Sequence, residues 1–328
     1  MTVERIVVAG ASGFIGRRLV ESFRADGATV SVIGRGAADA RWGDHAGIAR
    51  LVDGADLLVN LAGKSVNCRY TPSNRAEILR SRVDTTTQLA RAVRAAASPP
   101  PLWINSSTAT IYRHADDRPM TEADGEIGSG FSVDVATAWE QAFFADELPG
   151  TRRVALRIAI VLGDGGALTP LKWLARLGLG GPQLDGHWPT SRSRRAAGTD
   201  HRFGTPGGRQ RFSWIHLDDV VGIVRFLRGH PELDGVVNVT SPNPTDNRGF
   251  MRTVRYVLGM PVGLPAPRWL LEIGMSVLRT ESELVLKSRW AMPERLLQAG
   301  YRFEHPTLDP ALRDILSDRG LPAHPEHR

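Results

Sequence analysis

The apolar and polar positions at the start of the chain follow one another in the order strand, turn, helix, strand. Residues 4–9 form a short apolar run of the kind that lies buried in a parallel sheet. Residues 17–27 then place apolar side chains at helical spacing and end at a glycine, and residues 29–33 form a second apolar run. This order predicts the first strand–helix–strand unit of a parallel sheet.

Later segments continue the same alternation. We expect further buried strands at residues 57–63, 102–107 and 153–162, and a helix over residues 74–97 that stops before three consecutive prolines. Residues 214–240 are expected to return to the sheet. The pattern therefore predicts an α/β protein with a Rossmann-type doubly wound parallel sheet and a smaller C-terminal substrate lobe.

Composition narrows the class of protein. Of the 328 residues, 42% are hydrophobic, which is enough for a sizeable core, yet no apolar run approaches the roughly 18 residues that a membrane helix needs. The N-terminus has no basic region followed by an apolar one, so we expect a cytoplasmic protein without a membrane partner. The single cysteine, Cys68, excludes an internal disulfide and a cysteine-based metal cluster.

The charge of the chain does not point to nucleic acid. The net charge is +6 and the isoelectric point is near 10, but only Lys64, Lys172 and Lys287 are lysines. No segment interleaves basic and aromatic residues as an RNA-binding sheet does. We therefore expect no nucleic-acid partner, because net charge alone concerns solubility and non-specific attraction.

The turn after the first strand carries the strongest chemical signal, the segment GASGFIG at residues 10–16. Its first glycine permits a tight turn, its second lets backbone N–H groups approach a pyrophosphate, and its third lets the helix pack close to the strand. The phosphates would lie at the helix N-terminus, where free N–H groups favour negative charge. The residues expected to contact a dinucleotide here are Gly10, Ser12, Gly13, Phe14, Ile15 and Gly16.

The end of the second strand indicates which dinucleotide binds. NAD sites usually place an acidic residue there for the ribose 2′-hydroxyl, whereas an arginine suits the 2′-phosphate of NADP(H). This chain has Arg35 between two glycines and no acid before Asp39. A guanidinium can hold a phosphate by two hydrogen bonds, so the sequence favours NADP(H). The alternative is that Arg35 is a solvated loop residue in an arginine-rich chain.

Motifs spread along almost the whole chain resemble one known family. Besides residues 10–16, they include NLAG at residues 60–63, residues 209–219 and the C-terminal segment 292–303. Together they resemble the atypical extended short-chain dehydrogenases/reductases of the epimerase family, a group of NAD-dependent epimerase/dehydratase-like proteins that includes the bacterial YfcH-type proteins. The resemblance implies an NADP(H) site and says little about the substrate. Further cofactor contacts are expected at Leu61, Ala62, Gly63, Ser106, Ser107 and Arg157.

The resemblance also places candidate catalytic residues. The segment at residues 106–112 matches the strand end of sugar epimerases, which puts Thr108 in the position of the catalytic hydroxyl and Tyr112 near the pocket, where it usually packs. The alternative role for Thr108 is a hydrogen bond to the local backbone.

The usual Tyr-x-x-x-Lys pair is missing. In the superfamily the lysine lowers the pKa of a tyrosine that exchanges the proton. The residues four before the three lysines are Asn60, Leu168 and Glu283, and the family alignment puts Ser132 at the tyrosine position. Any proton transfer must therefore use another group.

Four residues are candidates for the substrate pocket, namely Arg82, Ser132, Arg209 and His216. An arginine such as Arg82 suits an anionic substrate, although a structural role is equally consistent with its position. His216 precedes Asp218 and Asp219, which we expect to cap the next helix. With no cysteine or second histidine at ligand spacing, we expect no metal site.

The predicted organisation has two parts. Residues 1–166 are expected to form the NADP(H)-binding domain, and residues 167–213 and 241–328 the substrate-side lobe. An arginine- and glycine-rich insertion at about residues 183–208 shows no periodicity and is expected to be a mobile loop. Two roles remain open for this insertion, a surface loop or a lid over an anionic ligand.

Two functions also remain open. The first is an NADP(H)-dependent oxidoreductase or epimerase that acts on a small molecule, for which an anionic group is one option, without the Tyr-x-x-x-Lys pair. The second is a non-catalytic NADP(H)-binding protein with a regulatory or interaction role. The glycine turn supports both equally, the missing pair favours the second, and the Ser-Ser-Thr strand end with a long substrate-side lobe favours the first.

Overall fold

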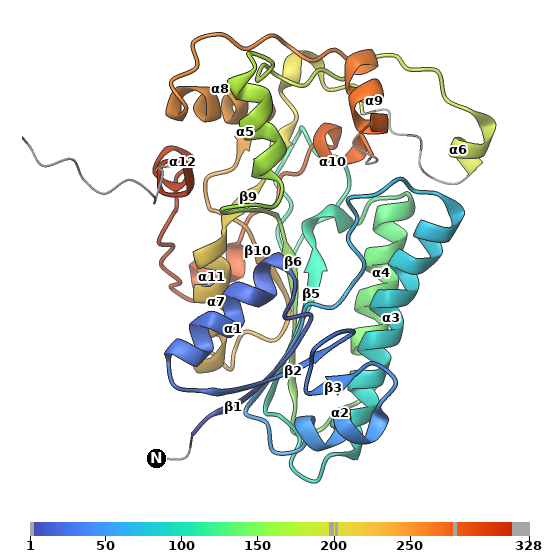
Figure 1. Ribbon diagram of the computed structural model, residues 1–328, viewed down its shortest axis with the longest axis vertical. Helices are drawn as coiled ribbons and strands as arrows, with labels where there is room; N and C mark the ends of the chain where they lie inside the picture. Colours follow the sequence, from blue (N-terminus) through green and yellow to red (C-terminus); the bar gives the residue numbers. More distant parts are fainter. Residues whose placement is uncertain (1–2, 197–199, 201–202, 278–280, 317–328) are drawn as a thin grey trace, which may run out of the picture.

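A parallel sheet of seven strands forms the centre of the protein, as the computed structural model shows (Figure 1). The structure describes residues 3–196, 200, 203–277 and 281–316. In spatial order the strands are β3 (Ala40–Arg41), β2 (Thr29–Gly34), β1 (Arg5–Ala9), β4 (Leu57–Asn60), β5 (Leu102–Thr108), β6 (Arg152–Ile158) and β10 (Gly235–Val239). Since every neighbouring pair runs parallel and the order reverses at β1, the predicted doubly wound Rossmann-type sheet is confirmed.

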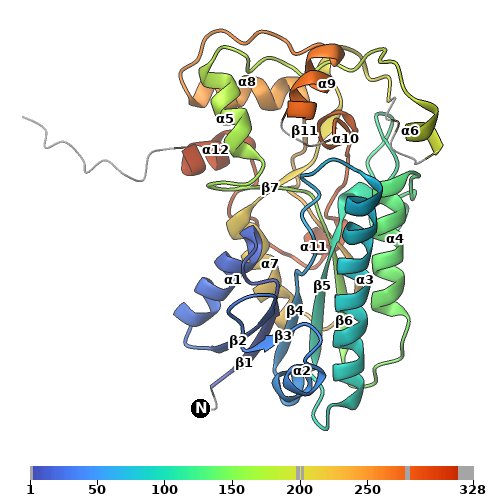
Figure 2. The same ribbon diagram turned by 45° about the vertical axis from the view of Figure 1, so that its right-hand side comes forward.

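Alternate residues of the strands enter two separate cores. On β1, Ile6 and Val8 pack into one core, whereas Val7 and Ala9 pack into the other. The first core is covered by α1 (Phe14–Ala25), α7 (Leu217–Gly229) and α11 (Glu294–Gln298), and the second by α2 (His45–Val52), α3 (Pro72–Ala95) and α4 (Phe131–Phe144) (Figures 1 and 2). Strands buried on both faces explain the near-continuous apolar runs of the sequence.

The remaining elements lie mostly beyond the carboxyl ends of the sheet strands (Figure 2). They are η1 (Ala109–Ile111), β7 (Ile160–Leu162), α5 (Leu168–Arg176), α6 (Arg192–Ala196), η2 (Pro206–Gly208), β8 (Arg211–Phe212), β9 (Trp214–His216), β11 (Thr245–Asp246), α8 (Asn247–Val257), α9 (Arg268–Val277), α10 (Glu283–Leu286) and α12 (Leu308–Leu316). Among the described residues, no helix is both long and apolar enough to cross a bilayer.

Two sequence-based boundaries differ from the structure. Helix α3 begins at Pro72, two residues before the expected start, because the Thr71 side chain accepts from the Asn74 N–H and proline suits the first helical position. The strand expected at residues 153–162 is divided at Ala159, whose N–H bonds the carbonyl of Val239, while the next residues leave the central sheet to pair with β9.

The return to the sheet and the insertion also differ in detail. Of residues 214–240, β10 joins the central sheet, whereas β9 pairs with β7 in a separate two-stranded sheet. The insertion expected to be without structure contains the short helix α6 and the turn η2. Its residues 197–199 and 201–202 lie outside the described residues.

Candidate functional site

A cavity of about 600 Å³ opens where β1, α1 and the end of β2 meet. Its walls contain Gly10 and Ser12 of the glycine turn and Arg35 beyond β2, as the sequence predicted for a cofactor site. Two residues of α1 that the sequence did not single out, Arg17 and Arg24, also line it. Their spacing of seven residues places both on one helix face, a signal that was present in the sequence.

The glycine turn leaves space that side chains would fill. Gly10 has a φ of +84°, and a Cβ there would lie 2.7 Å from the carbonyl carbon of Leu61. A Cβ at Gly16 would overlap the carbonyl oxygen of Gly10 and lie 2.8 Å from the Cα of Ala11. Gly13 precedes the first residue of α1 and supplies no side-chain cap, so the first N–H groups of the helix remain available to a phosphate. These residues fit a dinucleotide pyrophosphate.

The charges around the cavity distinguish between the two dinucleotides. Arg17, Arg24 and Arg35 face a single acid, Glu21. The first acid after β2, Asp39, accepts from the Val32 N–H at 2.7 Å and is therefore engaged by the backbone of β2. Three guanidinium groups and no free acid at the strand end suit a 2′-phosphate.

The loop after β4 approaches the glycine turn closely. Ala62 is buried, and its N–H donates to Asn60 Oδ1 at 3.0 Å, while Asn60 Nδ2 donates to Asn105 Oδ1 at 2.7 Å. Leu61 lies against Gly10, and the exposed Gly63 lies against the guanidinium of Arg82. Of the predicted cofactor residues in this loop, Leu61 and Ala62 thus border the glycine turn, and Gly63 lies beside Arg82. Phe14 packs against the loop after β7 at Gly163 and Gly166.

Three other predicted cofactor residues are buried or half-buried in the protein. Ser107 Oγ donates to Glu140 Oε1 at 2.6 Å, and Arg157 donates to the two oxygens of the same carboxylate at 2.9 and 2.8 Å. Glu140 therefore engages both side chains, which gives them a structural role that the sequence did not reveal. Ser106 is half-buried, and its hydroxyl lies 3.4 Å from the carbonyl of Ser107.

Thr108 ends β5 and is half-buried. Its Oγ1 accepts from the Thr110 N–H at 3.1 Å and so caps the short turn η1. Accepting that bond leaves the hydroxyl proton available to donate. The local backbone role and the polarising role that the sequence left open are therefore compatible.

Tyr112 belongs to a buried structural network rather than to the pocket surface. Its hydroxyl lies 2.9 Å from Asn238 Oδ1 and 3.1 Å from the Thr121 carbonyl, and it accepts from Arg157 Nη1 at 3.0 Å. Burial raises the pKa of the phenol, against the opposing charge of Arg157. The packing role expected for Tyr112 agrees with these contacts.

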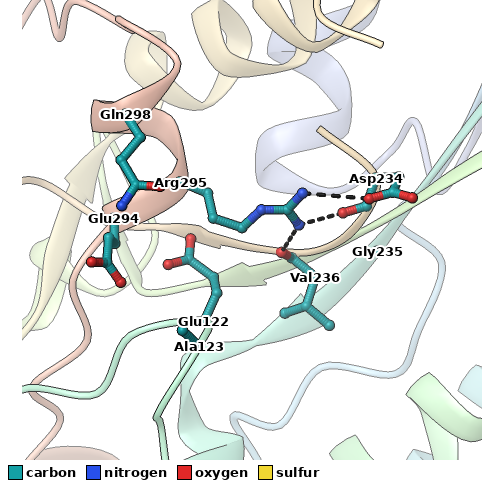
Figure 3. Close-up of a pocket in the computed structure, with 8 residues that line it drawn as sticks. All are labelled: Glu122, Ala123, Asp234, Gly235, Val236, Glu294, Arg295 and Gln298. Atoms are coloured by element: carbon teal, nitrogen blue, oxygen red, sulfur yellow. Dashed lines mark hydrogen bonds and ion pairs between the residues drawn. The ribbon is translucent and has the colours of Figure 1, made fainter. Parts of the chain in front are cut away.

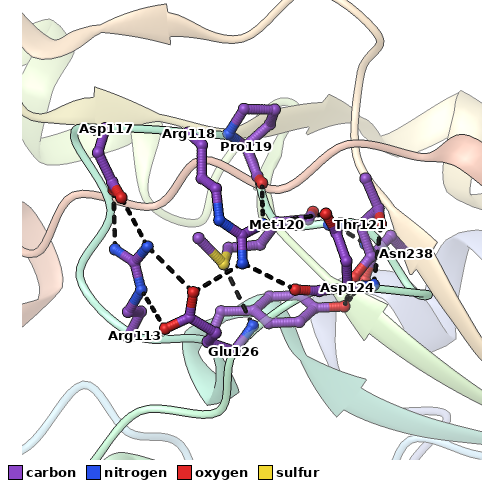
Figure 4. A network of polar contacts seen from close by, with 10 residues as sticks. Arg113, Asp117, Arg118, Pro119, Met120, Thr121, Asp124, Glu126 and Asn238 are labelled. Carbon is purple, nitrogen blue, oxygen red and sulfur yellow. Dashed lines mark hydrogen bonds and ion pairs between the residues drawn. The ribbon is translucent and has the colours of Figure 1, made fainter.

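The loop that follows Tyr112 is held by a charged network at the surface (Figure 4). Arg113 pairs with Asp117 and Glu126, and Arg118 pairs with Asp124 and Glu126. Because these groups are exposed, each pair alone stabilises the protein little, but the shared Glu126 links them into one arrangement that fixes the loop.

Two of the four candidates for the substrate pocket lie on facing helices. Arg82 of α3 donates to the carbonyls of Lys64 and Ile78, both at 3.0 Å, and stacks 5.0 Å above the Trp139 ring of α4. Burial lowers the pKa of Arg82 to about 10, so the guanidinium is still charged at neutral pH. Ser132, in the first turn of α4, donates to Glu283 Oε2 at 2.6 Å.

The other two candidates lie elsewhere. Arg209 is exposed and follows η2. His216 is buried and caps α7, because its Nδ1 accepts from the Asp218 N–H at 3.2 Å. The sequence assigned this cap to Asp218 and Asp219, which is wrong: both lie within the first turn, and Asp219 instead accepts from Tyr301, Glu304 and His305.

His216 also belongs to a group with metal-ligand chemistry that spacing along the chain did not reveal. One ligand atom from each of His216, Asp218, His305 and Asp314 lies within 4.8 Å of the others. However, Nδ1 of His216 already accepts the amide N–H, so the neutral ring carries its proton on Nε2, 3.5 Å from Asp314. Burial, reinforced by His305, lowers the pKa of His216 and keeps this neutral form. The geometry favours a helix cap over a ligand.

The insertion is joined to the segment before α10 by an ion pair. Arg194 of α6 donates to Glu281 Oε2 at 2.9 Å, and Glu281 also accepts from the Tyr70 N–H at 2.9 Å. Arg195, in contrast, donates to the carbonyl of Thr190 within the insertion.

A second cavity, of about 460 Å³, lies beside the edge strand β10 (Figure 3). Its carboxylates come from Glu122, Asp234 and Glu294, against the single cation Arg295. Arg295 donates to the Val236 carbonyl at 2.8 Å, while Glu122 accepts from the Asn238 N–H at 2.8 Å. This excess of negative charge is unsuitable for phosphate groups, so the dinucleotide belongs to the first cavity.

Comparison with known proteins agrees with this site. The sequence pattern of the NAD dependent epimerase/dehydratase family matches residues 6–240. The chain belongs to this family. A second pattern, the domain of unknown function DUF1731, matches residues 266–315. The resemblance inferred from the motifs is therefore confirmed, including its C-terminal segment.

Relatives extend over nearly the whole chain. Epimerase family protein YfhF of Bacillus subtilis is 29% identical over 324 residues, which cover 96% of this chain and 98% of the relative. Epimerase family protein SDR39U1 of Bos taurus is 31% identical over 324 residues, which cover 95% of this chain and all of the relative.

Solved structures show the same fold. The crystal structure of human epimerase family protein SDR39U1 (isoform 2) with NADPH has a TM-score of 0.80 at 29% identity and covers 96% of this chain and 99% of that one. UDP-N-acetylglucosamine 4-epimerase from Bacillus cereus has a TM-score of 0.69 at 16% identity, over 99% of both chains. This epimerase family protein therefore has the NAD(P)-binding Rossmann fold of extended short-chain dehydrogenases/reductases.

Proposed function

We propose that this epimerase family protein is an NADP(H)-dependent oxidoreductase or epimerase that acts on a small molecule in the cytoplasm. The observation that carries the choice of cofactor is the cavity at the glycine turn, with Arg17, Arg24 and Arg35 on its walls and Asp39 engaged by the backbone. The human relative solved with NADPH supports the same choice.

In this proposal, different residues bind the cofactor and activate the substrate. The N–H groups at the start of α1 hold the pyrophosphate, and Arg35 with Arg17 or Arg24 holds the 2′-phosphate. When bound, NADP(H) supplies or accepts a hydride. Thr108 donates its hydroxyl proton in a hydrogen bond to the reacting oxygen, which it can do while Oγ1 accepts from Thr110.

The substrate we propose is a small molecule with an anionic group. The support is Arg82, which remains charged at neutral pH and lies beside Gly63 in the loop after β4. A buried cation attracts an anion more strongly than one in water because solvent screens it less.

Calorimetry with NADPH, followed by a screen of carbonyl and hydroxyl compounds with and without carboxylate or phosphate groups, tests the proposal. We expect tight NADPH binding and turnover of an anionic compound, which Thr108→Ala reduces on the order of 10²-fold or more without weakening NADPH binding. Tight binding without turnover across the screen would favour the non-catalytic, regulatory or interaction role, and absence of NADPH binding would reject both.

A further inference from the structure

Polar side chains surround Ser132, the residue that stands at the tyrosine position of the missing Tyr-x-x-x-Lys pair. The Ser132 hydroxyl donates to Glu283 Oε2 at 2.6 Å, and the Tyr70 hydroxyl lies 3.5 Å from Ser132 Oγ. Tyr70 and Glu283 are buried, with 8% and 4% of their surface exposed, whereas Ser132 is half-buried. A half-buried hydroxyl that donates to a buried carboxylate has the geometry of a proton-exchanging pair.

The same carboxylate belongs to a segment that is bound to the strand end of Thr108. Lys287 Nζ donates to the Thr110 carbonyl at 2.7 Å, and Arg289 Nε donates to Thr110 Oγ1 at 3.0 Å. Helix α4, which carries Ser132, packs on this turn through Val133 and Ala136. The helix that carries Ser132 and the segment that carries Glu283 and Lys287 therefore both contact the turn that follows Thr108.

The charges of the cluster affect its proton affinities. Burial lowers the pKa of Lys287 to about 8, while the negative charge of Glu283 acts to raise it and Arg289 to lower it. Burial and the charge of Glu283 raise the pKa of Tyr70 to about 12, so its phenol stays protonated at neutral pH. The charged and titratable groups around Glu283 are thus Lys287 and Arg289 on its own segment, Tyr70 from the loop before α3, and Glu281 nearby.

We propose that Ser132 is the catalytic hydroxyl of the reaction pocket and that it exchanges protons with Glu283, whose charge Lys287 balances. This relay rests on the proposed oxidoreductase or epimerase function. It replaces a pair on a single helix turn by a hydroxyl from α4 and a carboxylate and an ammonium from the C-terminal part of the chain.

The proton balance of the relay is complete. When a substrate alcohol is oxidised, its O–H proton moves to Ser132 Oγ while the Ser132 proton moves to Glu283, and the hydride leaves with the cofactor. Glu283 then releases the proton to solvent as the product leaves, and Lys287 stays an ammonium throughout. In the reducing direction each transfer reverses, and the carbonyl oxygen receives its proton from Ser132.

Because the chain has only three lysines, the pKa of Lys287 can be measured directly by NMR titration. Lysine labelled with ¹³C at the ε-carbon gives signals from only Lys64, Lys172 and Lys287, and Lys287→Arg assigns the third. We expect Lys287 to titrate with a midpoint near 8. Glu283→Gln should lower that midpoint by at least about half a pH unit, because removing a neighbouring negative charge destabilises the ammonium.

Glu281→Gln is the matched control for this titration. Glu281 is equally buried but bonds Arg194 and the Tyr70 backbone, so its change should leave the midpoint of Lys287 in place. An unchanged midpoint in Glu283→Gln would overturn the relay, because the two groups would then not be coupled.

The wild-type protein supplies a second measurement that does not depend on folding of a variant. If the relay serves the nicotinamide end of the site, the positive ring of NADP⁺ should give Lys287 a lower midpoint than NADPH does. Equal midpoints with both ligands bound would overturn the relay. Failure of both ligands to bind would instead reject the proposed function, and the titration of the free protein would still report the coupling.

Once a substrate is in hand, turnover distinguishes catalysis from structure. Ser132→Ala should lower kcat by about 10²–10⁴-fold with unchanged NADPH affinity, Ser132→Thr should recover most of the loss, and Tyr70→Phe should have a small effect. Full activity in Ser132→Ala would overturn the role of Ser132.

Discussion

The cofactor cavity and the proposed proton relay are built in opposite ways. The cavity takes nearly all its walls from one strand–helix–strand unit between Gly10 and Ala37. The relay joins Ser132 to a carboxylate 151 residues away and Thr110 to an ammonium 177 residues away. The first can be rebuilt from a local motif, whereas the second exists only when the whole chain is folded. The difference teaches that a local motif is enough to form the dinucleotide cavity, whereas the proposed relay depends on contacts between distant segments.

Closing the glycine turn should have the largest effect, and it should affect only the cavity. Gly16→Ala is expected to reduce NADPH affinity on the order of 100-fold, about 2.8 kcal/mol, because its Cβ would overlap the backbone of Gly10 and Ala11. Calorimetry measures the affinity. Gly229→Ala, at the end of α7 with no atom within 4 Å of the added Cβ, should bind normally. Wild-type affinity in Gly16→Ala would contradict the assigned site.

Changing the charge beyond β2 should have a smaller effect, on selectivity alone. We expect the protein to bind NADPH at least about tenfold more tightly than NADH, or about 1.4 kcal/mol, and Arg35→Ala to remove most of that preference. Arg35→Asp should go further by repelling the 2′-phosphate. Fluorescence titration with both nucleotides measures the ratio, and Arg41→Ala on β3, a residue that does not line the cavity, is the control. Equal affinities in the wild type would remove the basis for NADP(H).

Removing the Tyr112 hydroxyl should affect the scaffold more than the chemistry. Tyr112→Phe removes the hydrogen-bond partner of Arg157 Nη1 and of Asn238 Oδ1, which should cost about 1–2 kcal/mol of unfolding free energy, measured by denaturant titration. Its kcat should fall by well under 10²-fold. A larger drop in a folded variant would show that this phenol is the acid, and the relay at Ser132 would then be unnecessary.

Releasing the insertion should have the smallest effect. Arg194→Ala breaks the ion pair to Glu281 and is expected to increase protease cleavage near α6 by a few-fold with little change in melting temperature, since the pair is partly exposed. Arg195→Ala, which loses only a contact inside the insertion, is the matched control. If the insertion is a lid, NADPH or an anionic substrate should slow cleavage of the wild type; equal rates with and without ligand would leave it a surface loop.

The same contrast explains how much could be predicted from the sequence. Apolar periodicity and the glycine turn gave the sheet and the cavity, because these are set by neighbours along the chain. Helical spacing also predicts that Arg17 and Arg24 lie on one face of α1.

Some roles could not be predicted because contacts between distant residues determine them. No local pattern shows that Glu140 binds Ser107 and Arg157, or that His216 caps α7 in place of the two aspartates. In the sequence, Tyr70, Glu283 and Lys287 are isolated residues, and Glu283 precedes Lys287 by four positions, where a Tyr-x-x-x-Lys pair would have a tyrosine. Their meeting depends on tertiary packing between α4 and the C-terminal segment.

The two borders of the central sheet bear on how the protein behaves when many copies are crowded together. An outer strand with free N–H and C=O groups invites a neighbouring molecule to add its own strand, which is a common first step of aggregation. One border here is the two-residue β3, and the other, β10, has Glu122 on the Asn238 N–H and Arg295 on the Val236 carbonyl. On β10, side chains thus occupy backbone groups to which a strand of another molecule would bind. This protects the sheet against edge-to-edge pairing between molecules.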